Sequence, residues 1–191
     1  MRPIFVLLLP ILFLGCKRTS PLVDEGVLAL AEEGDAAAQM KVGLAFDKEE
    51  NYEDAALWYK KAAEQGLAEA QNNLGVMYKD GQGVKQDFKE AARWFRLAAQ
   101  QDNTLAQLNL GWLYHAGKGV CQDADSAFFW YSKAAQKGHD TAQLNLGILY
   151  LQQKDTTTAI HWLQQAAQNG NGGAQRILRE IEDQVTCSVS K

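Results

Sequence analysis

The dipeptide Ala-Gln recurs along most of this chain, and this periodicity constrains the fold more than any other feature. Its alanines are 32, 36, 36 and 32 residues apart, at Ala38, Ala70, Ala106, Ala142 and Ala174. Self-similarity with a period of about 20 to 50 residues is typical of repeat architectures, in which copies of one small unit stack on each other. The sequence therefore predicts a solenoid of about four repeats.

Two further patterns keep the same phase. Glycine stands five residues after each of the first four alanines, and an aromatic residue stands eight after. Later in each repeat, an alanine lies three residues before a tryptophan and an alanine pair begins four residues after it, at Trp58, Trp94, Trp130 and Trp162. Spacings of three, four and eight residues place side chains on one face of a helix. Each repeat is therefore predicted to be a pair of helices.

Small residues facing large ones explain how the two helices could pack. We expect Gly111 and its equivalents to let a neighbouring backbone come close, and Trp94 and its equivalents to fill the space between helices. Glycines with left-handed backbone conformation are expected to end the second helices, with Asp102 in that place in one repeat; the glycines are Gly66, Gly138 and Gly170.

Residues 70–100, AQNNLGVMYKDGQGVKQDFKEAARWFRLAAQ, resemble the Sel-one-like repeat family, a variant of the tetratricopeptide repeat. The resemblance covers residues 24–183. It implies an all-α fold, a right-handed α/α solenoid of helix pairs that binds another protein and has no catalytic activity. Residues 28–34 are expected to cap one end. A helix starting near Ala174 is expected to cap the other, because Arg179 stands where the repeated glycine belongs.

The first 15 residues have the composition of a secretory signal peptide. A charged start is followed by an apolar run over residues 4–14, which is shorter than the ~20 residues that a membrane-spanning helix needs. Gly15-Cys16 then resembles the lipobox of bacterial lipoproteins, although Phe13 and Leu14 depart from its usual pattern. The resemblance implies a lipid anchor on Cys16. A cleaved signal without lipid, or a buried cysteine, remains an alternative.

An anchored chain would lie at the periplasmic face of the bacterial envelope. Lys17, which follows the cysteine, favours the outer membrane over the inner one by resemblance to the enterobacterial sorting rule. We divide the chain into a signal peptide (1–15), a tether (16–23), the repeat solenoid (24–183) and a C-terminal tail (184–191).

Little in the sequence indicates catalysis. The net charge of -4 gives no electrostatic preference for nucleic acid. His115, His139 and His161 occupy unrelated positions of the repeat, so we predict no catalytic, cofactor-binding or metal-binding residues. Residues 188–191 spell the S-x-x-K pattern of penicillin-recognising enzymes, but they end the chain. Cysteine-rich relatives have been linked to that chemistry, so a β-lactam-hydrolysing or penicillin-binding enzyme is the alternative function.

Cys121 and Cys187 bear on the state of an exported chain, because the compartment outside the inner membrane is oxidising. Both are expected at the same edge of the solenoid, about two repeats apart. An extended tail at ~3.3 Å per residue could cover much of that distance. A disulfide between them is one possibility, and two free thiols are the other.

The candidate binding groove lies on the first helices of the repeats, whose concave surface usually receives partners. Residues two and six after each alanine point away from the core stripe. The apolar ones are Val76, Leu108, Trp112, Leu144 and Ile148. A tryptophan among aliphatic residues is the usual composition of a binding hot spot. The alternative is that these side chains pack sideways against adjacent first helices, and Asn73, Asn109 and Asn145 are expected to form a structural ladder.

A basic stripe is predicted on one second helix, where it could contact anionic lipid or an acidic partner or simply be solvated. Its members are Lys85, Lys89, Arg93 and Arg96.

The expected partner is therefore another protein, bound without a cofactor. The protein would be an adaptor in envelope assembly or signalling, an immunity protein that binds a secreted effector, or a surface protein that binds a host protein.

Overall fold

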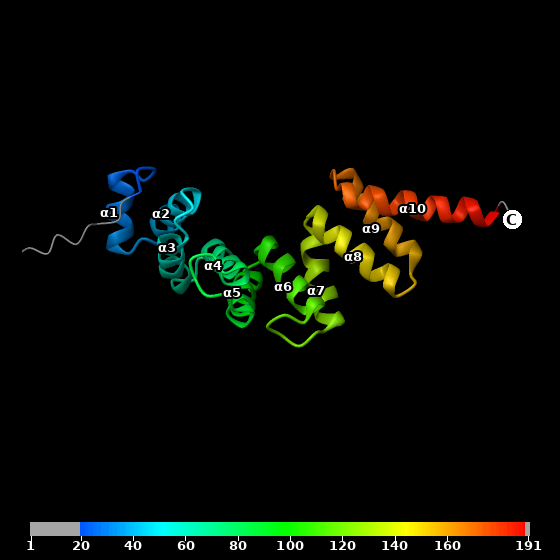
Figure 1. The fold of residues 1–191 in the computed structure, drawn as a ribbon, viewed down its shortest axis with the longest axis horizontal. Coiled ribbons are helices and arrows are strands. Elements are labelled where there is room, and N and C mark those ends of the chain that lie inside the picture. The colour runs from blue at the N-terminus through cyan, green and yellow to red at the C-terminus, as the bar shows by residue number, and fades with distance from the viewer. Residues whose placement is uncertain (1–19, 190–191) are drawn as a thin grey trace, which may run out of the picture.

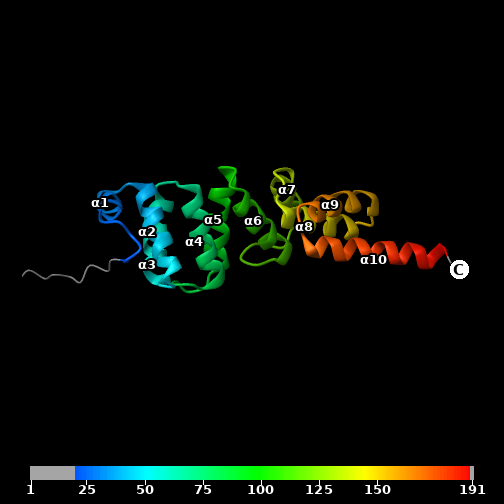
Figure 2. The ribbon, with the colours of Figure 1, turned by 90° about the horizontal axis from the view of Figure 1, so that it is seen from above.

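The computed structural model describes residues 20–189, with side chains to residue 183, and within this part it contains ten helices and no strand. Lipidation at Cys16 and the signal peptide fall outside the described residues. The helices follow one another along an elongated body (Figures 1 and 2), which confirms the predicted all-α solenoid. They are α1 (Glu25–Glu33), α2 (Ala36–Lys48), α3 (Tyr52–Glu64), α4 (Ala68–Asp80), α5 (Phe88–Gln100), α6 (Thr104–Ala116), α7 (Ala124–Gln136), α8 (Asp140–Gln152), α9 (Thr156–Gln168) and α10 (Gly172–Val189).

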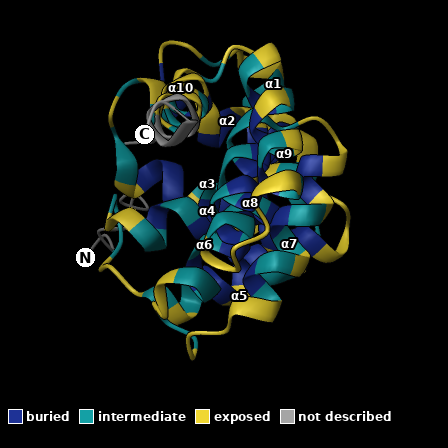
Figure 3. Ribbon diagram, turned by 90° about the vertical axis from the view of Figure 1, so that its right-hand side faces the viewer, coloured by how far each residue is buried: buried dark blue, intermediate teal, exposed yellow. Residues whose placement is uncertain are grey.

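The eight helices α2 to α9 form four pairs, and each pair is one repeat. Within a pair the first helix carries Ala-Gln and the second carries tryptophan. Buried residues gather where helices face each other, and exposed residues cover the outer surfaces and the turns (Figure 3). Each repeat therefore buries its apolar side against its own partner helix and its neighbours, as expected of a solenoid.

The repeated glycine makes room chiefly for a side chain of the paired helix, whereas the prediction named the backbone. Of the four, only Gly147 has a backbone atom among the nearest neighbours of an added Cβ atom, the Ala159 carbonyl oxygen at 3.3 Å. A Cβ atom built on Gly111 would lie 2.7 Å from Cδ1 of Tyr131, and one on Gly75 would lie 2.6 Å from Cε1 of Phe95. The residue that fills this space is the one immediately after the repeated tryptophan. It is Tyr59, Phe95, Tyr131 or Leu163, and all four are buried.

The repeated glutamine explains the second half of the Ala-Gln motif. In every repeat its side-chain Nε2 donates to a backbone carbonyl in the last turn of the preceding second helix, eight residues earlier. The pairs are Gln39–Ala31, Gln71–Ala63, Gln107–Ala99, Gln143–Ala135 and Gln175–Ala167. The last carbonyls of a helix lack partners inside the helix. The glutamines supply these partners and thereby fix each pair to the next.

The turns follow the predicted pattern. Gly66, Gly138 and Gly170 have φ values of 94°, 84° and 88°, and Asp102 takes the same left-handed conformation with φ 64°. The longer turns after α4 and α6 both begin with a left-handed glycine, whereas those after α2 and α8 are shorter.

Both ends of the solenoid differ from the predicted boundaries. Ser20 is buried, its hydroxyl donates to Glu49, and Val23 packs on the first core cluster. Residues 20–23 therefore belong to the body and not to a free tether. At the other end, α10 continues to Val189, so most of the predicted tail is helical. The helix reaches this length because its amphipathic pattern continues past residue 183.

Candidate functional site

The predicted groove residues lie on three successive first helices. Val76 is on α4, Leu108 and Trp112 are on α6, and Leu144 and Ile148 are on α8; all five are partly buried. The structure brings three of them, Leu108, Trp112 and Ile148, to the walls of two adjoining cavities.

The first cavity has a volume of about 190 Å³ and crosses from α4 over α6 to α8. Its lining residues are Lys79, Leu108, Asn109, Trp112, Thr141 and Asn145. The second has about 200 Å³ and lies between α6, α7 and α8, where it is lined by Trp112, His115, Tyr131, Asn145 and Ile148. Trp112 and Asn145 belong to both. We call this continuous surface the Trp112 groove.

Trp112 is held from the other side by the neighbouring repeat. Its ring centroid is 6.4 Å from that of Phe88, at the start of α5. The Lys118 ammonium lies 5.1 Å from the Trp112 centroid and 5.0 Å from that of Phe88, which is the geometry of a cation–π contact. The indole is therefore oriented by packing while part of its surface remains open to the groove.

The other two predicted groove residues, Leu144 and Val76, line neither cavity and pack sideways, which was the alternative expectation. Leu144 packs sideways on the last core cluster, beside Leu163 and Ala174, and Val76 packs on the cluster of α5 and α6. Among the equivalents of the groove positions in the first two repeats, Met40 and Asn72 are buried. Leu44, the other equivalent in the first repeat, is exposed. Among the described residues, the cavities at the predicted positions lie along α6 and α8, in the middle repeats that the prediction singled out.

Tyr131 is a groove residue that the sequence reasoning missed. Its ring packs on Gly111, and the residue lines the second cavity together with Asn145. Burial raises the pKa of the Tyr131 phenol above its ordinary value, so the group keeps its proton. The signal was present in the sequence, as an aromatic residue that follows the repeated tryptophan.

The three repeated asparagines have different neighbours because of this residue. Asn73 lies beside Tyr59 and Asn145 beside Tyr131. Phe95 has no hydroxyl, and Asn109 donates instead to Oδ1 of Asn72, at 3.2 Å, while Asn72 donates to Oδ1 of Asn73, at 3.3 Å. Asn72 thus joins Asn109 to Asn73, as expected of a structural ladder between these two repeats.

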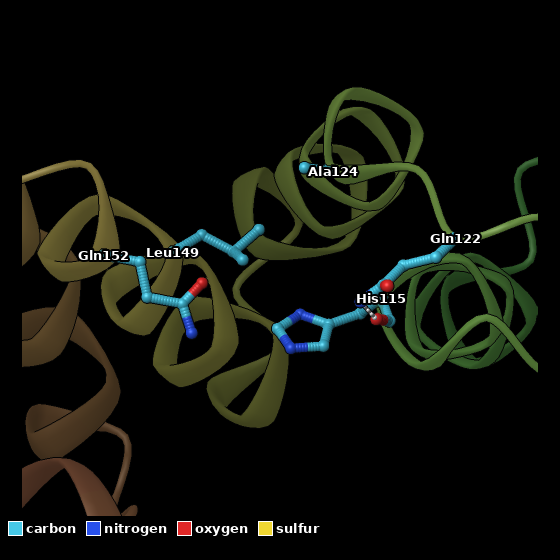
Figure 4. A pocket seen from close by; sticks show the side chains of 5 residues that line it. All are labelled: His115, Gln122, Ala124, Leu149 and Gln152. Carbon is cyan, nitrogen blue, oxygen red and sulfur yellow. Dashed lines mark hydrogen bonds between the residues drawn. The ribbon is translucent and has the colours of Figure 1, made fainter.

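A third cavity, of about 310 Å³, opens at the end of α6 towards α8. Figure 4 shows the imidazole of His115 projecting towards Leu149 and Gln152, while Gln122 donates to the His115 carbonyl oxygen. His115 thus stands between this cavity and the Trp112 groove. Its ring centroid lies 6.4 Å from that of Tyr131.

The predicted basic stripe is not a continuous patch. Lys85 precedes α5 and lies in the turn, so it is not on the helix. Arg93 lies over the Trp94 ring and pairs with Glu90, and Arg96 donates to the Tyr114 hydroxyl. The guanidinium groups of Arg93 and Arg96 thus contact other residues of the solenoid.

Cys121 lies in the turn between α6 and α7, where its thiol is free and exposed. Cys187 is in the last part of α10, whose side chains are not described. A helix advances only 1.5 Å per residue, so this segment does not form the extended tail that the predicted pairing requires. The disulfide itself stays a prediction.

The described residues were also searched for a metal site and for a membrane-spanning helix. They contain no group of three or more histidine, cysteine or acidic side chains that could hold a metal ion. None of the described helices is both long and apolar enough to cross a membrane.

Comparison with solved structures gives close likenesses. A protective antigen of uropathogenic Escherichia coli strains with an SLR fold is 34% identical, with a TM-score of 0.77, over 80% of this chain and 34% of that one. A Sel1 repeat protein from Oxalobacter formigenes is 35% identical, with a TM-score of 0.71, over 76% of this chain and 63% of that one. This chain thus spans less than two thirds of both proteins. Cysteine-rich protein B of Helicobacter pylori shares the fold, at 24% identity and a TM-score of 0.52, over 61% of this chain and 90% of that one.

A search of curated proteins by sequence finds no match. The Sel1 repeat pattern, in contrast, matches four successive segments, 36–67, 68–103, 104–139 and 141–171, which coincide with the four helix pairs. These segments make up most of the chain, and repeats of this kind generally form non-catalytic scaffolds for protein–protein interaction. The chain belongs to the Sel1 repeat family.

Proposed function

We propose that this protein binds a segment of another protein in the Trp112 groove, acting as an adaptor or as an immunity protein that holds an effector. The observation that carries the proposal is the partly open indole of Trp112, which lies between two adjoining cavities with Leu108 on one side and Ile148 on the other. A fixed aromatic side chain surrounded by aliphatic and amide groups is the composition of binding hot spots.

The polar groups of the same groove suit recognition of a peptide. They are the amides of Asn109 and Asn145, the hydroxyls of Thr141 and Tyr131, the imidazole of His115 and the amine of Lys79. These groups can form hydrogen bonds to a peptide backbone and its side chains.

We further propose that the protein is tethered at the periplasmic face of the envelope through lipid on Cys16, with the outer membrane favoured. A membrane tether of this kind would place the groove where exported or incoming proteins pass. Both roles, adaptor and immunity protein, require a stoichiometric complex and no chemical step.

The test is recovery of envelope proteins on immobilised wild-type protein and on two variants. Trp112→Ala removes the central side chain of the groove. This variant should recover about thirtyfold less of the specific partner than the wild type, as expected of a hot-spot residue. Phe129→Ala is the matched control, since it removes an aromatic side chain that is 50% exposed but lies outside the groove. Equal recovery by Trp112→Ala and the wild type would contradict the proposal.

The alternative enzymatic function has a direct test. The purified protein should leave the chromogenic β-lactam nitrocefin intact. Hydrolysis above that of a heat-denatured sample would favour the enzyme over the binding protein.

A further inference from the structure

Two of the four repeats place a tyrosine hydroxyl at the same position, but only one of them supplies an acceptor for its proton. In the first repeat the Tyr59 hydroxyl donates to Oδ2 of Asp47, at 3.3 Å, while Asn73 bonds to its oxygen. Asp47 lies nine residues after the repeated alanine of α2. The carboxylate, the hydroxyl and the amide form one hydrogen-bonded unit inside the protein.

The third repeat contains the same hydroxyl and amide without the carboxylate. Tyr131 and Asn145 take the places of Tyr59 and Asn73, and His115 takes the place of Asp47. No hydrogen bond donated by the Tyr131 hydroxyl is found among the described residues, whereas the Tyr59 hydroxyl has Asp47 as its acceptor. Tyr131, Asn145 and His115 instead line a cavity of about 200 Å³.

The lining of this cavity contains no group that would repel an anion. Among the described residues, no aspartate or glutamate lines either cavity of the Trp112 groove. Lys79, which lines the first cavity, is paired with Asp80 at 3.5 Å, so the preference for an anion rests on the Tyr131 hydroxyl and not on a free cation.

From this comparison we infer that the Trp112 groove binds a peptide segment of its partner in which an aspartate or glutamate stands close to a large apolar residue. The partner's carboxylate takes the position of Asp47, where it accepts from the Tyr131 hydroxyl. The apolar side chain packs on Trp112 and Ile148. This inference rests on the proposed function, and it adds the chemistry of the bound segment.

The probe is a peptide selected from a phage-displayed library of random dodecamers on the purified wild-type protein. The selected sequences should combine an acidic residue with an aromatic or aliphatic one. Replacing that acidic residue by its amide should weaken binding about tenfold or more, because hydrogen bonds to a charged group contribute more than neutral ones. Fluorescence anisotropy of the labelled peptide measures both affinities.

Variants of the two tyrosines make a matched pair. Tyr131→Phe should weaken binding of the acidic peptide about tenfold and leave binding of its amide counterpart unchanged. Tyr59→Phe removes the same atom outside the groove and should leave both affinities unchanged. Both variants should fold, because the chain itself has Phe95 in this position against Gly75.

A second pair of variants tests the position that corresponds to Asp47, which His115 occupies in the third repeat. His115→Asp would place a carboxylate where Asp47 lies in the first repeat, and the protein's own anion would then compete with that of the peptide. The acidic peptide should bind more weakly to His115→Asp than to His115→Asn, which is similar in size and uncharged.

The outcomes separate this inference from the proposed function. Selected peptides that lose affinity in Trp112→Ala, but bind equally well as acid or amide and ignore Tyr131→Phe, would overturn the inference alone. A selection that enriches no peptide dependent on Trp112 would contradict the proposed function as well. A dimer that dissociates in Trp112→Ala would assign the groove to a second copy of the chain and would overturn the inference.

Discussion

The residue after each repeated tryptophan determines how the two helices of a repeat meet. Tyr59, Phe95 and Tyr131 each place a ring on the glycine of the paired helix, and Leu163 fills the same place in the fourth repeat. A glycine in the middle of a helix costs about 1 kcal/mol relative to alanine. The repeat accepts this cost at the same position each time because the ring needs the space that a methyl group would take.

Gly75→Ala tests this packing. The added Cβ atom would lie 2.6 Å from Phe95, whose ring is fully buried. We expect the variant to lose about 1–2 kcal/mol of its free energy of unfolding, since the cost of overpacking exceeds the gain in helix propensity. Urea denaturation measures the change.

Gly172→Ala is the matched control for this substitution. Gly172 begins α10 and has no atom within 4 Å of an added Cβ, so the control should be neutral or slightly stabilising. Equal stability of the two variants would contradict the packing argument.

The sequence predicted single residues well where their role repeats and poorly where it does not. The repeated alanines, glycines and aromatic residues followed from helical periodicity alone. Trp112 was recognised because it departs from the register. Tyr131 was missed, although it follows a repeated tryptophan, because only the structure shows that it lines a cavity with His115 and Asn145. Leu144 and Val76 were assigned to the groove by register, but they pack partly buried on core clusters and line neither cavity of the groove.

At the scale of helices, the ends of the second helices are joined into a ladder of side-chain amides. Gln101 donates to Gln71, Asn169 donates to Gln143, and Gln65 donates to Gln39. In the third repeat the donor position is Lys137, which does not donate to Gln107 and donates instead to the backbone oxygen and the carboxylate of Asp102. The Oε1 atoms of Gln39, Gln71 and Gln143 accept these hydrogen bonds, whereas Oε1 of Gln107 is buried and has no partner.

Lys137→Gln would supply the missing donor. A buried acceptor without a partner costs about 1–3 kcal/mol, while the exposed pair of Lys137 and Asp102 contributes little. We expect the variant to be more stable by about 1 kcal/mol in urea denaturation. Lys41→Gln removes the same charge from an exposed position of α2 and should leave stability unchanged. A less stable Lys137→Gln protein would argue against the ladder.

A hydrogen bond between α8 and the turn that precedes α10 should make the stability of the protein depend on pH. The hydrogen bond from Asn171 to Asp140, at 2.7 Å, holds the pKa of that carboxyl below its ordinary value of 3.8. A lowered folded-state pKa stabilises the protein above the unfolded-state pKa, and this contribution is lost as the pH falls through the folded-state value.

Asp140→Asn should therefore flatten the loss of stability below about pH 4. Thermal unfolding of both proteins at about pH 7 and about pH 3 measures the difference. If both proteins lose the same stability on acidification, the contribution assigned to Asp140 is absent.

Helix existence and type could be predicted throughout, but the two ends of the array could not. The repeat pattern stops at Arg179, which replaces the packing glycine, so no further second helix can pack on α10 as Tyr131 packs on Gly111. How far α10 continues depends on its own amphipathic pattern and not on the repeat. Residues 20–23 lack any repeat signal, yet the burial of Ser20 fixes them to α2.

At the scale of the whole molecule, the described helices form an elongated stack with α1 at one end and α10 at the other (Figure 1). The Trp112 groove lies on α4, α6, α7 and α8, in the middle of this order. A tether at residue 16 would thus hold the array by its end and leave the groove free.

The lipid anchor is tested by metabolic labelling with radioactive palmitate in a bacterial host. The wild-type protein should incorporate label and fractionate with membranes, because two or more acyl chains anchor a protein stably. Cys16→Ser should do neither. Equal labelling of both proteins, or membrane association of Cys16→Ser, would exclude lipid on this residue as the anchor.

The central claim is that a partner protein occupies the Trp112 groove, and site-specific photo-crosslinking in cells tests it most directly. A benzophenone amino acid placed at Ile148, within the groove, is compared with one placed at Phe129, on an exposed position of α7. We predict one discrete protein adduct from position 148, lost when Trp112 is also changed to alanine, and none from position 129. An adduct from position 129 alone, or one from position 148 that persists without Trp112, would contradict the claim.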